Sequence, residues 1–397
     1  MTATAQTGLL DEARGLLDDV VAVRRRIHRH PEIGLTLPRT QQVVLEALDG
    51  LGLDVRTGQK TTSVVATLEG GRPGRTILLR ADMDALPLEE DTGLDFASEV
   101  DGAMHACGHD AHVAMLLGAA RILAARRASL AGRVVFMFQP GEEGYHGARV
   151  MIEEGLLEAT RPDAAFGLHA GARLPAGVIG TRGGALLAAG DTFQITVRGD
   201  GGHASAPHDC LDPIPVACEI VQAFQTMVTR RVNAFDPAIV TVAKIEAGTT
   251  RNIIPETASM LGTIRTVSEK TRAGVLDNLQ RVAEGVAGAH GARAEVNLIK
   301  GYPVTVNDDD FAARVVRVAT DLLGPDRVQQ MATPIMGSED FSYVLQRVTG
   351  AFAFLGTRPA EGPAPPNHSN RMLVNESALP AGVAMHAAVA LDFLNGR

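Results

Sequence analysis

Short apolar runs alternate with helical patterns through the first half of this chain, and that alternation limits the possible folds more than any other feature. The apolar runs are β-branched or aliphatic and lie at 64–68, 76–79, 134–138 and 164–168. The helical patterns lie at 9–27, 40–51, 113–126 and 148–154. Strands that alternate with helices in this way predict an α/β layer with a mostly parallel central sheet flanked by helices.

The pattern changes after residue 187. The next segments are expected to be strand, helix, strand, strand, helix and strand, at 193–198, 214–231, 239–245, 259–266, 269–290 and 293–299. This order is typical of a ferredoxin-like α+β unit, and helices return from about residue 304. We therefore expect a discontinuous α/β domain of residues 1–187 and 304–397, with residues 188–303 inserted as a smaller domain.

Composition excludes several classes of partner. The 397 residues are too many for one compact core, so more than one domain is expected. A net charge of -9 and the absence of Trp argue against nucleic acid and anionic membranes as partners. The three cysteines are an odd and small number, typical of a reduced, cytoplasmic protein. The N-terminus lacks the features of a signal peptide, and no apolar run is expected to be long enough to cross a bilayer.

Polar side chains follow three of the predicted strands. The run 76–79 leads into Asp82 and Asp84, the run 134–138 into Glu142 and Glu143, and the run 164–168 into His169. In open α/β sheets, ligands bind at the carboxyl ends of the strands. Because polar residues follow three separate strands in this way, we predict that they form one shared site.

A nine-residue stretch, 104–112, holds one thiol, three imidazoles and one carboxylate, and a helical pattern follows it. Ligands of these types at this density indicate a transition metal, with zinc or manganese favoured. A nucleophilic Cys107 paired with a histidine is the alternative.

Other polar residues near the motifs have less specific interpretations. We expect His105 and His112 to be structural or orienting, and Asp110 to cap the following helix. His28 and His30 are expected to be surface or helix-end residues.

Glu142 and Glu143 are neighbours in a turn flanked by Gly141 and Gly144. Adjacent residues of a strand point in opposite directions, but on such a turn one carboxylate can reach a metal while the other reaches a water molecule held by the metal. The second carboxylate would be a suitable general base, which is typically worth about 10²–10⁴ in rate.

In order along the chain, several motifs resemble the M20 metallopeptidase family, and more narrowly its amidohydrolase branch of hippurate, N-acyl-amino-acid and auxin-conjugate hydrolases. The motifs are Arg80–Pro87, Met104–Asp110, Gly141–Gly144, Gly167–His169, His203–Pro207, Asn252–Pro255 and Gly337–Phe341. The resemblance covers nearly the whole chain. It is specific for the branch and poorly specific for the substrate.

The resemblance implies a site with two divalent metal ions, zinc or manganese, with cobalt or nickel also suitable. Its ligands would be Cys107, His109, Glu143, His169 and His368, with Cys107 as the bridging ligand. Much of the wider family has a His-x-Asp motif where this chain has Asp82-Met83-Asp84. The branch shares this departure, which leaves Asp84 an orienting role and the role of Asp82 open.

The resemblance also implies roles for other residues. Glu142 would be the general base, and the inserted domain would be a lid that forms a homodimer. His203 of this lid would donate to the oxyanion, often in the partner subunit's site. Asn252 and Arg265 of the lid could hold the carboxylate of the substrate, although Arg265 could equally be a surface charge.

The sequence thus predicts a metal-dependent amidohydrolase. Its substrates would be N-acyl amino acids, which are small molecules, and a water molecule that bridges the metals would attack their amide bond. An M20-type dipeptidase or a carbamoyl-amino-acid hydrolase is the alternative. A cysteine amidase that uses Cys107 would leave Glu143, His169 and His368 without a role. A non-catalytic binding protein of the same fold would have no need of Glu142.

Overall fold

The computed structural model describes residues 3–396, and the chain divides into two compact units. Unit 1 comprises Met1–Gly184, Val306–Thr333 and Asp340–Arg397, and unit 2 comprises Ala185–Thr305 and Pro334–Glu339. Residues 334–339 were assigned to the α/β domain from the sequence, and the structure corrects this. They belong to unit 2 because the amide of Ala188 donates to the carbonyls of Ile335 and Gly337, at 3.0 and 2.9 Å.

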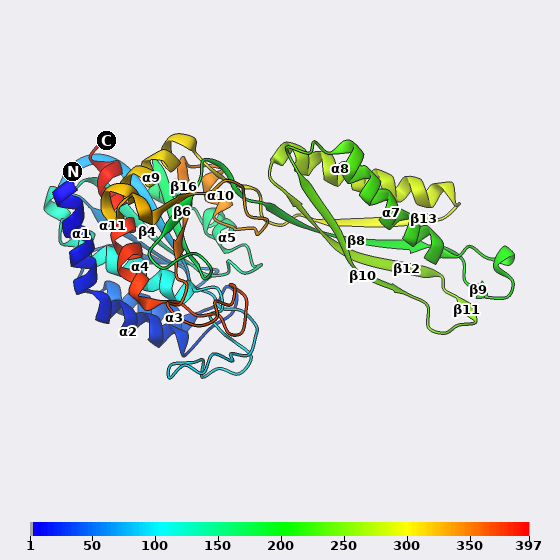
Figure 1. The fold of residues 1–397 in the computed structure, drawn as a ribbon, viewed down its shortest axis with the longest axis horizontal. Coiled ribbons are helices and arrows are strands. Elements are labelled where there is room, and N and C mark those ends of the chain that lie inside the picture. Colours follow the sequence, from blue (N-terminus) through cyan, green and yellow to red (C-terminus); the bar gives the residue numbers. More distant parts are fainter. Residues whose placement is uncertain (1–2, 397) are drawn as a thin grey trace. The chain divides into compact units, whose positions relative to one another are not determined.

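An eight-stranded sheet forms the centre of unit 1, in the order β1-β2-β4-β3-β5-β16-β6-β15 (Figure 1). Its strands are β1 (Asp54–Thr57), β2 (Val64–Glu69), β3 (Arg72–Asp82), β4 (Ala131–Gln139), β5 (Ala164–Gly171), β6 (Ile179–Thr181), β15 (Val328–Gln330) and β16 (Gly350–Gly356). The central strands β4, β3, β5 and β16 are parallel, whereas β1, β2 and β6 make antiparallel pairs. This confirms the predicted mostly parallel sheet.

Helices flank this sheet, as predicted. They are α1 (Ala3–Gly15), α2 (Leu17–His28), α3 (Pro38–Leu48), α4 (His109–Ala124), α5 (Gly147–Glu153), α6 (Leu156–Thr160), α9 (Asp309–Leu323), α10 (Ser342–Leu345) and α11 (Leu379–Leu394). The helix expected over 9–27 is in fact two, α1 and α2, which are separated at Leu16. The preceding Gly15 favours such a break, because glycine is a poor helix former.

Helix α11 corrects one expectation about membranes. The segment Glu376–Leu394 has a mean hydropathy of 1.4, so by length and composition it could cross a bilayer. However, 94 % of the segment is buried inside the protein, where α11 packs against α4 and β3. A helix that is apolar on all sides and covered by protein is a core helix.

Unit 2 is a four-stranded antiparallel sheet with the order β10-β12-β8-β13, together with helices α7 (Pro213–Arg231) and α8 (Glu269–Ala289) (Figure 1). The strands are β8 (Ala189–Arg198), β10 (Ala238–Ala247), β12 (Thr257–Thr266) and β13 (Arg293–Ile299). Chain order and sheet order together match the ferredoxin-like unit that the sequence predicts. Alternate residues of β8 are buried, and the ring of Phe193 lies 5.8 Å from that of Phe224 in α7.

Four further strands are short. They are β7 (Gly184–Leu187) and β14 (Thr305–Asn307), which lie where the chain passes between the units, and β9 (Gly202–His203) and β11 (Ile253–Ile254), which pair with each other in unit 2.

A buried ion pair joins sheet and helix in unit 2. The guanidinium of Arg272 in α8 donates two hydrogen bonds to Asp191 in β8, at 2.8 and 2.6 Å. Asp191 also accepts the amide of Gly301 at 3.0 Å, and its side chain is only 1 % exposed. Because Asp191 cannot exchange this partner for water, it depends on Arg272 for its charge balance.

We expect the Arg272→Ala variant to lose about 3–5 kcal/mol of unfolding free energy, since it leaves the Asp191 carboxylate buried without its counter-charge. Urea unfolding, followed by circular dichroism and by probes in each unit, measures this loss. Arg281→Ala is the matched control, because Arg281 lies on the same helix and is exposed. Equal losses in the two variants would contradict the importance of the pair.

Candidate metal centre

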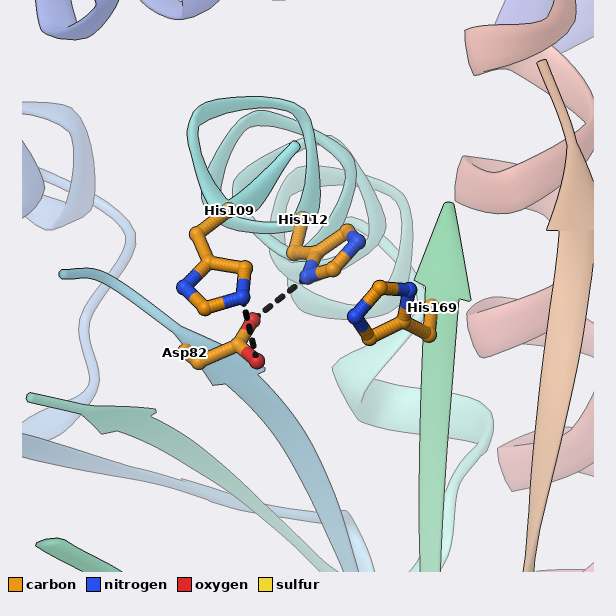
Figure 2. A group of neighbouring side chains, drawn as sticks. All are labelled: Asp82, His109, His112 and His169. Carbon is orange, nitrogen blue, oxygen red and sulfur yellow. Dashed lines mark hydrogen bonds and ion pairs between the residues drawn. The ribbon is translucent and has the colours of Figure 1, made fainter. Parts of the chain in front are cut away.

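The candidate site lies at the carboxyl edge of the central sheet of unit 1. Asp82 ends β3, Glu142 and Glu143 follow β4, and His169 lies near the end of β5. These three strands are parallel neighbours, so their ends meet at one edge. Helix α4 begins at His109 above this edge. Figure 2 shows His109 and His112 of α4 beside Asp82, with His169 facing them from β5.

The structure brings the five expected ligand residues into one cluster. Ligand atoms of Cys107, His109 and Glu143 all lie within 4.8 Å of one another. The Cys107 Sγ lies 3.4 Å from the Nε2 of His169, and the Nε2 of His368 lies 3.2 Å from the Oε1 of Glu143. A thiol, three imidazoles and a carboxylate therefore meet from four separate parts of the chain.

The donor set fits a cation. Both ring nitrogens of His109 are buried, and neither makes a hydrogen bond of ordinary geometry to the described residues. The nearest carboxylate oxygens to the ring are those of Asp82, at 3.3 Å from Nε2, and Asp84, at 3.6 Å from Nδ1. Buried polar atoms are nearly always satisfied, so these groups are suited to a bound ion. Thiolate, imidazole and carboxylate together suit zinc or manganese.

His169 presents a free lone pair to the cluster. Its Nδ1 lies 2.9 Å from the carbonyl oxygen of Ala170, which can only accept, so Nδ1 carries the proton. The other nitrogen, Nε2, is then unprotonated, and it is the one that faces Cys107. This is the tautomer that a metal ligand requires.

Both ring nitrogens of His112 make hydrogen bonds within the protein. Its Nε2 accepts the backbone amide of Ala170 at 2.7 Å, so Nδ1 carries the proton and donates to Asp82. Figure 2 shows the contact between His112 and Asp82. His112 therefore has no lone pair left for a metal, and it orients Asp82 and the end of β5.

Asp84 holds the turn that carries the two glutamates. Its Oδ1 and Oδ2 accept the amides of Glu142 and Glu143, each at 2.9 Å. Asp84 is buried, so both bonds form away from water. The carboxylate thus determines the backbone direction from which both side chains leave.

A buried arginine makes hydrogen bonds to residues at the same carboxyl edge of the sheet. Arg80 is fully buried and donates to Asp82 at 2.8 Å, to Gln139 at 2.9 Å and to Asp340 at 3.2 Å. Asp340 also accepts the amide of Ala148 at 2.9 Å, at the start of α5. Asp82, whose role the sequence left open, is therefore an anchor between Arg80 and His112.

One expectation near α4 is wrong. Asp110 does not cap this helix, whose N-cap is Gly108 with φ +87°. Instead the Oδ2 of Asp110 accepts from Arg24 at 2.9 Å and from His28 at 2.8 Å. His28 is the last residue of α2, one of the two positions expected for it, but it is buried, and its Nε2 bonds Glu90 at 3.2 Å. The fold brings α2 against the start of α4, which a local sequence pattern cannot indicate.

His105 and His30 do not belong to the ligand cluster. His105 is buried without a hydrogen-bond partner among the described residues, and burial lowers its pKa to about 3, so the ring stays neutral. The side chain of His30 is 38 % exposed, in keeping with a helix end.

The charges of the cluster shift its pKa values. Hydrogen bonds to Cys107 and Glu143 raise the pKa of His368 to about 10. Burial alone would lower the pKa of His109, but the charges of Asp82 and Cys107 raise it well above its usual range. Burial raises the pKa of the Cys107 thiol and lowers that of His169 well below its usual range.

The remaining predicted site residues lie in unit 2. His203 is exposed and pairs with Ile253 of β11, and the carbonyl of Asn252 accepts the amide of Ala204 at 3.1 Å, so His203 and Asn252 are close together. Arg265 donates to the hydroxyl of Ser338 at 3.2 Å.

Arg265 is remote from that pair within unit 2. It lies eight residues along β12 from the start of that strand at Thr257, or about 26 Å at 3.3 Å per residue. Unit 2 therefore does not bring Arg265 to His203 and Asn252.

Sequence reasoning missed several residues that shape the site. They are Arg24, Arg80, Gln139, Ala170, Asp340 and Asn367. Arg80 and Asp340 stand inside the family motifs, and Asn367 directly precedes the expected ligand His368, so the positions of these three were available as a signal. The others contribute through partners far away in sequence.

Comparisons with known proteins agree with this architecture. The model of peptidase family M20/M25/M40 matches residues 78–392, a range that contains every proposed ligand. The chain is 40 % identical to thermostable carboxypeptidase 1 of Saccharolobus solfataricus, over 98 % of both chains. It is 39 % identical to the IAA-amino acid hydrolase ILR1-like 2 of Arabidopsis thaliana, over 99 % of this chain and 90 % of the relative.

Among solved structures, the fold matches the YXEP protein of Bacillus subtilis, which is described as a dinuclear metal-binding peptidase from the M20 family. The match has a TM-score of 0.84 and 34 % identity, and it covers 97 % of this chain and 99 % of that one.

We expect Asp84→Asn to lower the unfolding free energy by about 1–3 kcal/mol, because the amide can accept only one of the two backbone bonds and turns a donor toward the other. Chemical denaturation measures this change. Asp163→Asn is the control, since Asp163 accepts the amide of Thr76 through one oxygen, a bond that Asn can keep. A loss in Asp84→Asn no larger than in the control would contradict the proposed support of the turn.

Proposed function

Because the chain belongs to peptidase family M20/M25/M40, a family of hydrolases, we propose that it cleaves the amide bond of N-acyl amino acids and releases a carboxylic acid and a free amino acid. The observation that carries this proposal is the cluster of Cys107, His109 and Glu143 with Glu142 next in the chain. One relative is named an IAA-amino acid hydrolase, and this name describes a substrate of the same kind, which supports the substrate class.

The proposed cofactors are two divalent metal ions, zinc or manganese, with cobalt or nickel also suitable. Cys107, His109, Glu143, His169 and His368 would hold them, and Cys107 would be shared between the two. When bound, such ions polarise the carbonyl group of the substrate and acidify water. The Bacillus subtilis neighbour, described as dinuclear, supports the number of ions.

Glu142 is the proposed general base. The residue is 6 % exposed, and its backbone amide is held by the carboxylate of Asp84. Glu142 takes a proton from the attacking water as the C–O bond forms. It then gives this proton to the nitrogen of the leaving amine as the C–N bond breaks, so protons balance over the cycle. Burial excludes bulk water, which would otherwise compete for the same proton.

His203 is the proposed donor to the oxyanion. The backbone amide of Ser205 donates to its Nδ1 at 3.1 Å, so Nδ1 must accept and Nε2 carries the proton. The ring therefore offers an N–H group without needing a positive charge. A donor aimed at developing oxyanion charge is worth about 2.7–4 kcal/mol in known cases.

The proposal includes a cytoplasmic homodimer formed through unit 2. Asn252, just before β11, and Arg265, in β12, are proposed to bind the carboxylate of the substrate, and within one unit 2 they lie far apart. A substrate of amino-acid size could meet both only if they came from two subunits. The separation thus supports a dimer in which His203 and Asn252 serve the partner subunit's site.

A peptide substrate is the second candidate function. The relative named thermostable carboxypeptidase 1 is 40 % identical over 98 % of both chains, and this favours an activity on peptides. A dipeptide and an N-acyl amino acid share the secondary amide and the free carboxylate, so the same residues serve both. The cysteine amidase gains no support, because burial raises the pKa of the Cys107 thiol and disfavours the thiolate.

Glu142→Gln should retain the metal ions but reduce turnover by about 10²–10⁴, because the amide cannot accept the proton. We would assay acetyl-, benzoyl- and indole-acetyl-amino acids and dipeptides on metal-defined enzyme, with metal content measured by mass spectrometry. Glu153→Gln is the control, as its side chain is 58 % exposed. A fully active Glu142→Gln enzyme would disprove the assignment of the base.

Metal binding should release protons and strengthen with rising pH. His368, with a pKa of about 10, and His109, with a raised pKa, keep their protons near neutral pH in the metal-free protein. A cation must displace these protons, so log Kd should fall by about one per pH unit for each proton displaced. Calorimetry from pH 6 to 9, in buffers of different ionisation enthalpy, tests this. An unchanged Kd over this range would contradict it.

A further inference from the structure

Asn367 precedes the proposed ligand His368, and its side chain contacts two other segments that carry ligands. Its Nδ2 donates to the carbonyl of Cys107 at 3.1 Å and to the carbonyl of Ala170 at 3.0 Å. Its Oδ1 lies 3.2 Å from the amide nitrogen of Ala172 and accepts from it. One carboxamide therefore joins the Cys107 loop, the end of β5 and the segment that carries His368.

The chemistry of this position requires an amide. Both N–H groups of Asn367 meet carbonyl oxygens, which can only accept, and its oxygen meets an N–H group, which can only donate. A carboxylate of the same shape would place a negative oxygen against the carbonyls of Cys107 and Ala170. The Nδ2 also lies 3.9 Å from the Sγ of Cys107, so the donor is close to the thiol itself.

Ala170 links Asn367 to the orientation of His169. The carbonyl of Ala170 accepts from the Nδ1 of His169 at 2.9 Å as well as from Asn367. That carbonyl determines which nitrogen of His169 is free to bind a metal. A second donor on the same oxygen fixes its position, and the ring orientation depends on it.

The backbone of His368 needs support of the same kind. His368 has φ +68°, a left-handed conformation that residues other than glycine rarely adopt. Its amide donates to the carbonyl of Ala106 at 2.7 Å, next to the bond that Asn367 makes to Cys107. Such conformations persist where the surrounding contacts determine them. These two adjacent bonds hold the backbone at His368 against the Cys107 loop.

We infer that Asn367 is a positioning residue of the metal centre. Through contacts with the backbone it fixes the positions of Cys107, His169 and His368 relative to one another. The inference rests on the proposed function, since it concerns the residues proposed to bind metal. Asn367 itself touches no reacting group, so its effect is expected in metal affinity and ligand geometry.

The test compares metal binding by the wild-type chain, Asn367→Asp and Asn367→Ala. Competition with a chromophoric chelator measures zinc affinity, and the charge-transfer band between cobalt and the thiolate reports the geometry at Cys107. We expect both variants to bind zinc about 10–100-fold more weakly and to shift the cobalt band. Asn367→Ala removes the hydrogen-bond donors without adding a charge. If Asn367→Asp does not fold, the comparison of Asn367→Ala with the wild type still tests the inference.

Asn375→Asp is the matched control. Asn375 is also half-buried and lies in the same C-terminal segment, but its amide bonds Arg358 and Ser377, neither of which is a proposed ligand. Its zinc affinity should stay within about twofold of the wild type. Unchanged affinity and spectra in the Asn367 variants, or an equal loss in Asn375→Asp, would overturn the inference. A wild-type chain that binds no zinc, manganese, cobalt or nickel would instead overturn the proposed function.

Discussion

The arrangement of the site depends on the imidazole of His112. One nitrogen donates to Asp82 at the end of β3, and the other accepts the amide of Ala170 near the end of β5. A single side chain of α4 thus bonds both strands, and both contacts are buried. His109 lies one turn before His112 on the same helix, and His169 precedes Ala170. The separation of these two proposed ligands therefore follows from how His112 joins helix and sheet.

Charge balance is the second constraint on unit 1. Arg80 is buried against Asp82 and Asp340, and Arg24 is buried against Asp110. Buried ion pairs add little net stability relative to apolar packing, but removing one partner is costly. We interpret these pairs as determinants of a unique arrangement. Each can be satisfied in only one register of strand and helix, and the ligand-bearing segments are next to them.

Local patterns predicted the elements well, because helix and strand periodicity are properties of neighbouring residues. The strand expected at 293–299 is β13 to the residue, and the buried run at 76–79 lies inside β3. Long-range pairing was not predictable in the same way. Asp110 looks like a helix cap in its local sequence, and only the packing of α2 shows that Arg24 and His28 occupy its carboxylate. Similarly, nothing near residue 265 indicates the distance from Arg265 to Asn252.

The sequence by itself determined the alternation of elements, the polar residues at three strand ends and the family to which the chain belongs. These are encoded locally, by side-chain periodicity and by motifs of a few residues. Tertiary structure alone decided which histidines keep a free lone pair, since His112 and His169 differ only in the partners that folding brings to them. It also decided that Asn367 meets Cys107 and Ala170, because hydrogen bonds across 260 and 197 residues exist only once the parallel strands and the C-terminal segment have packed.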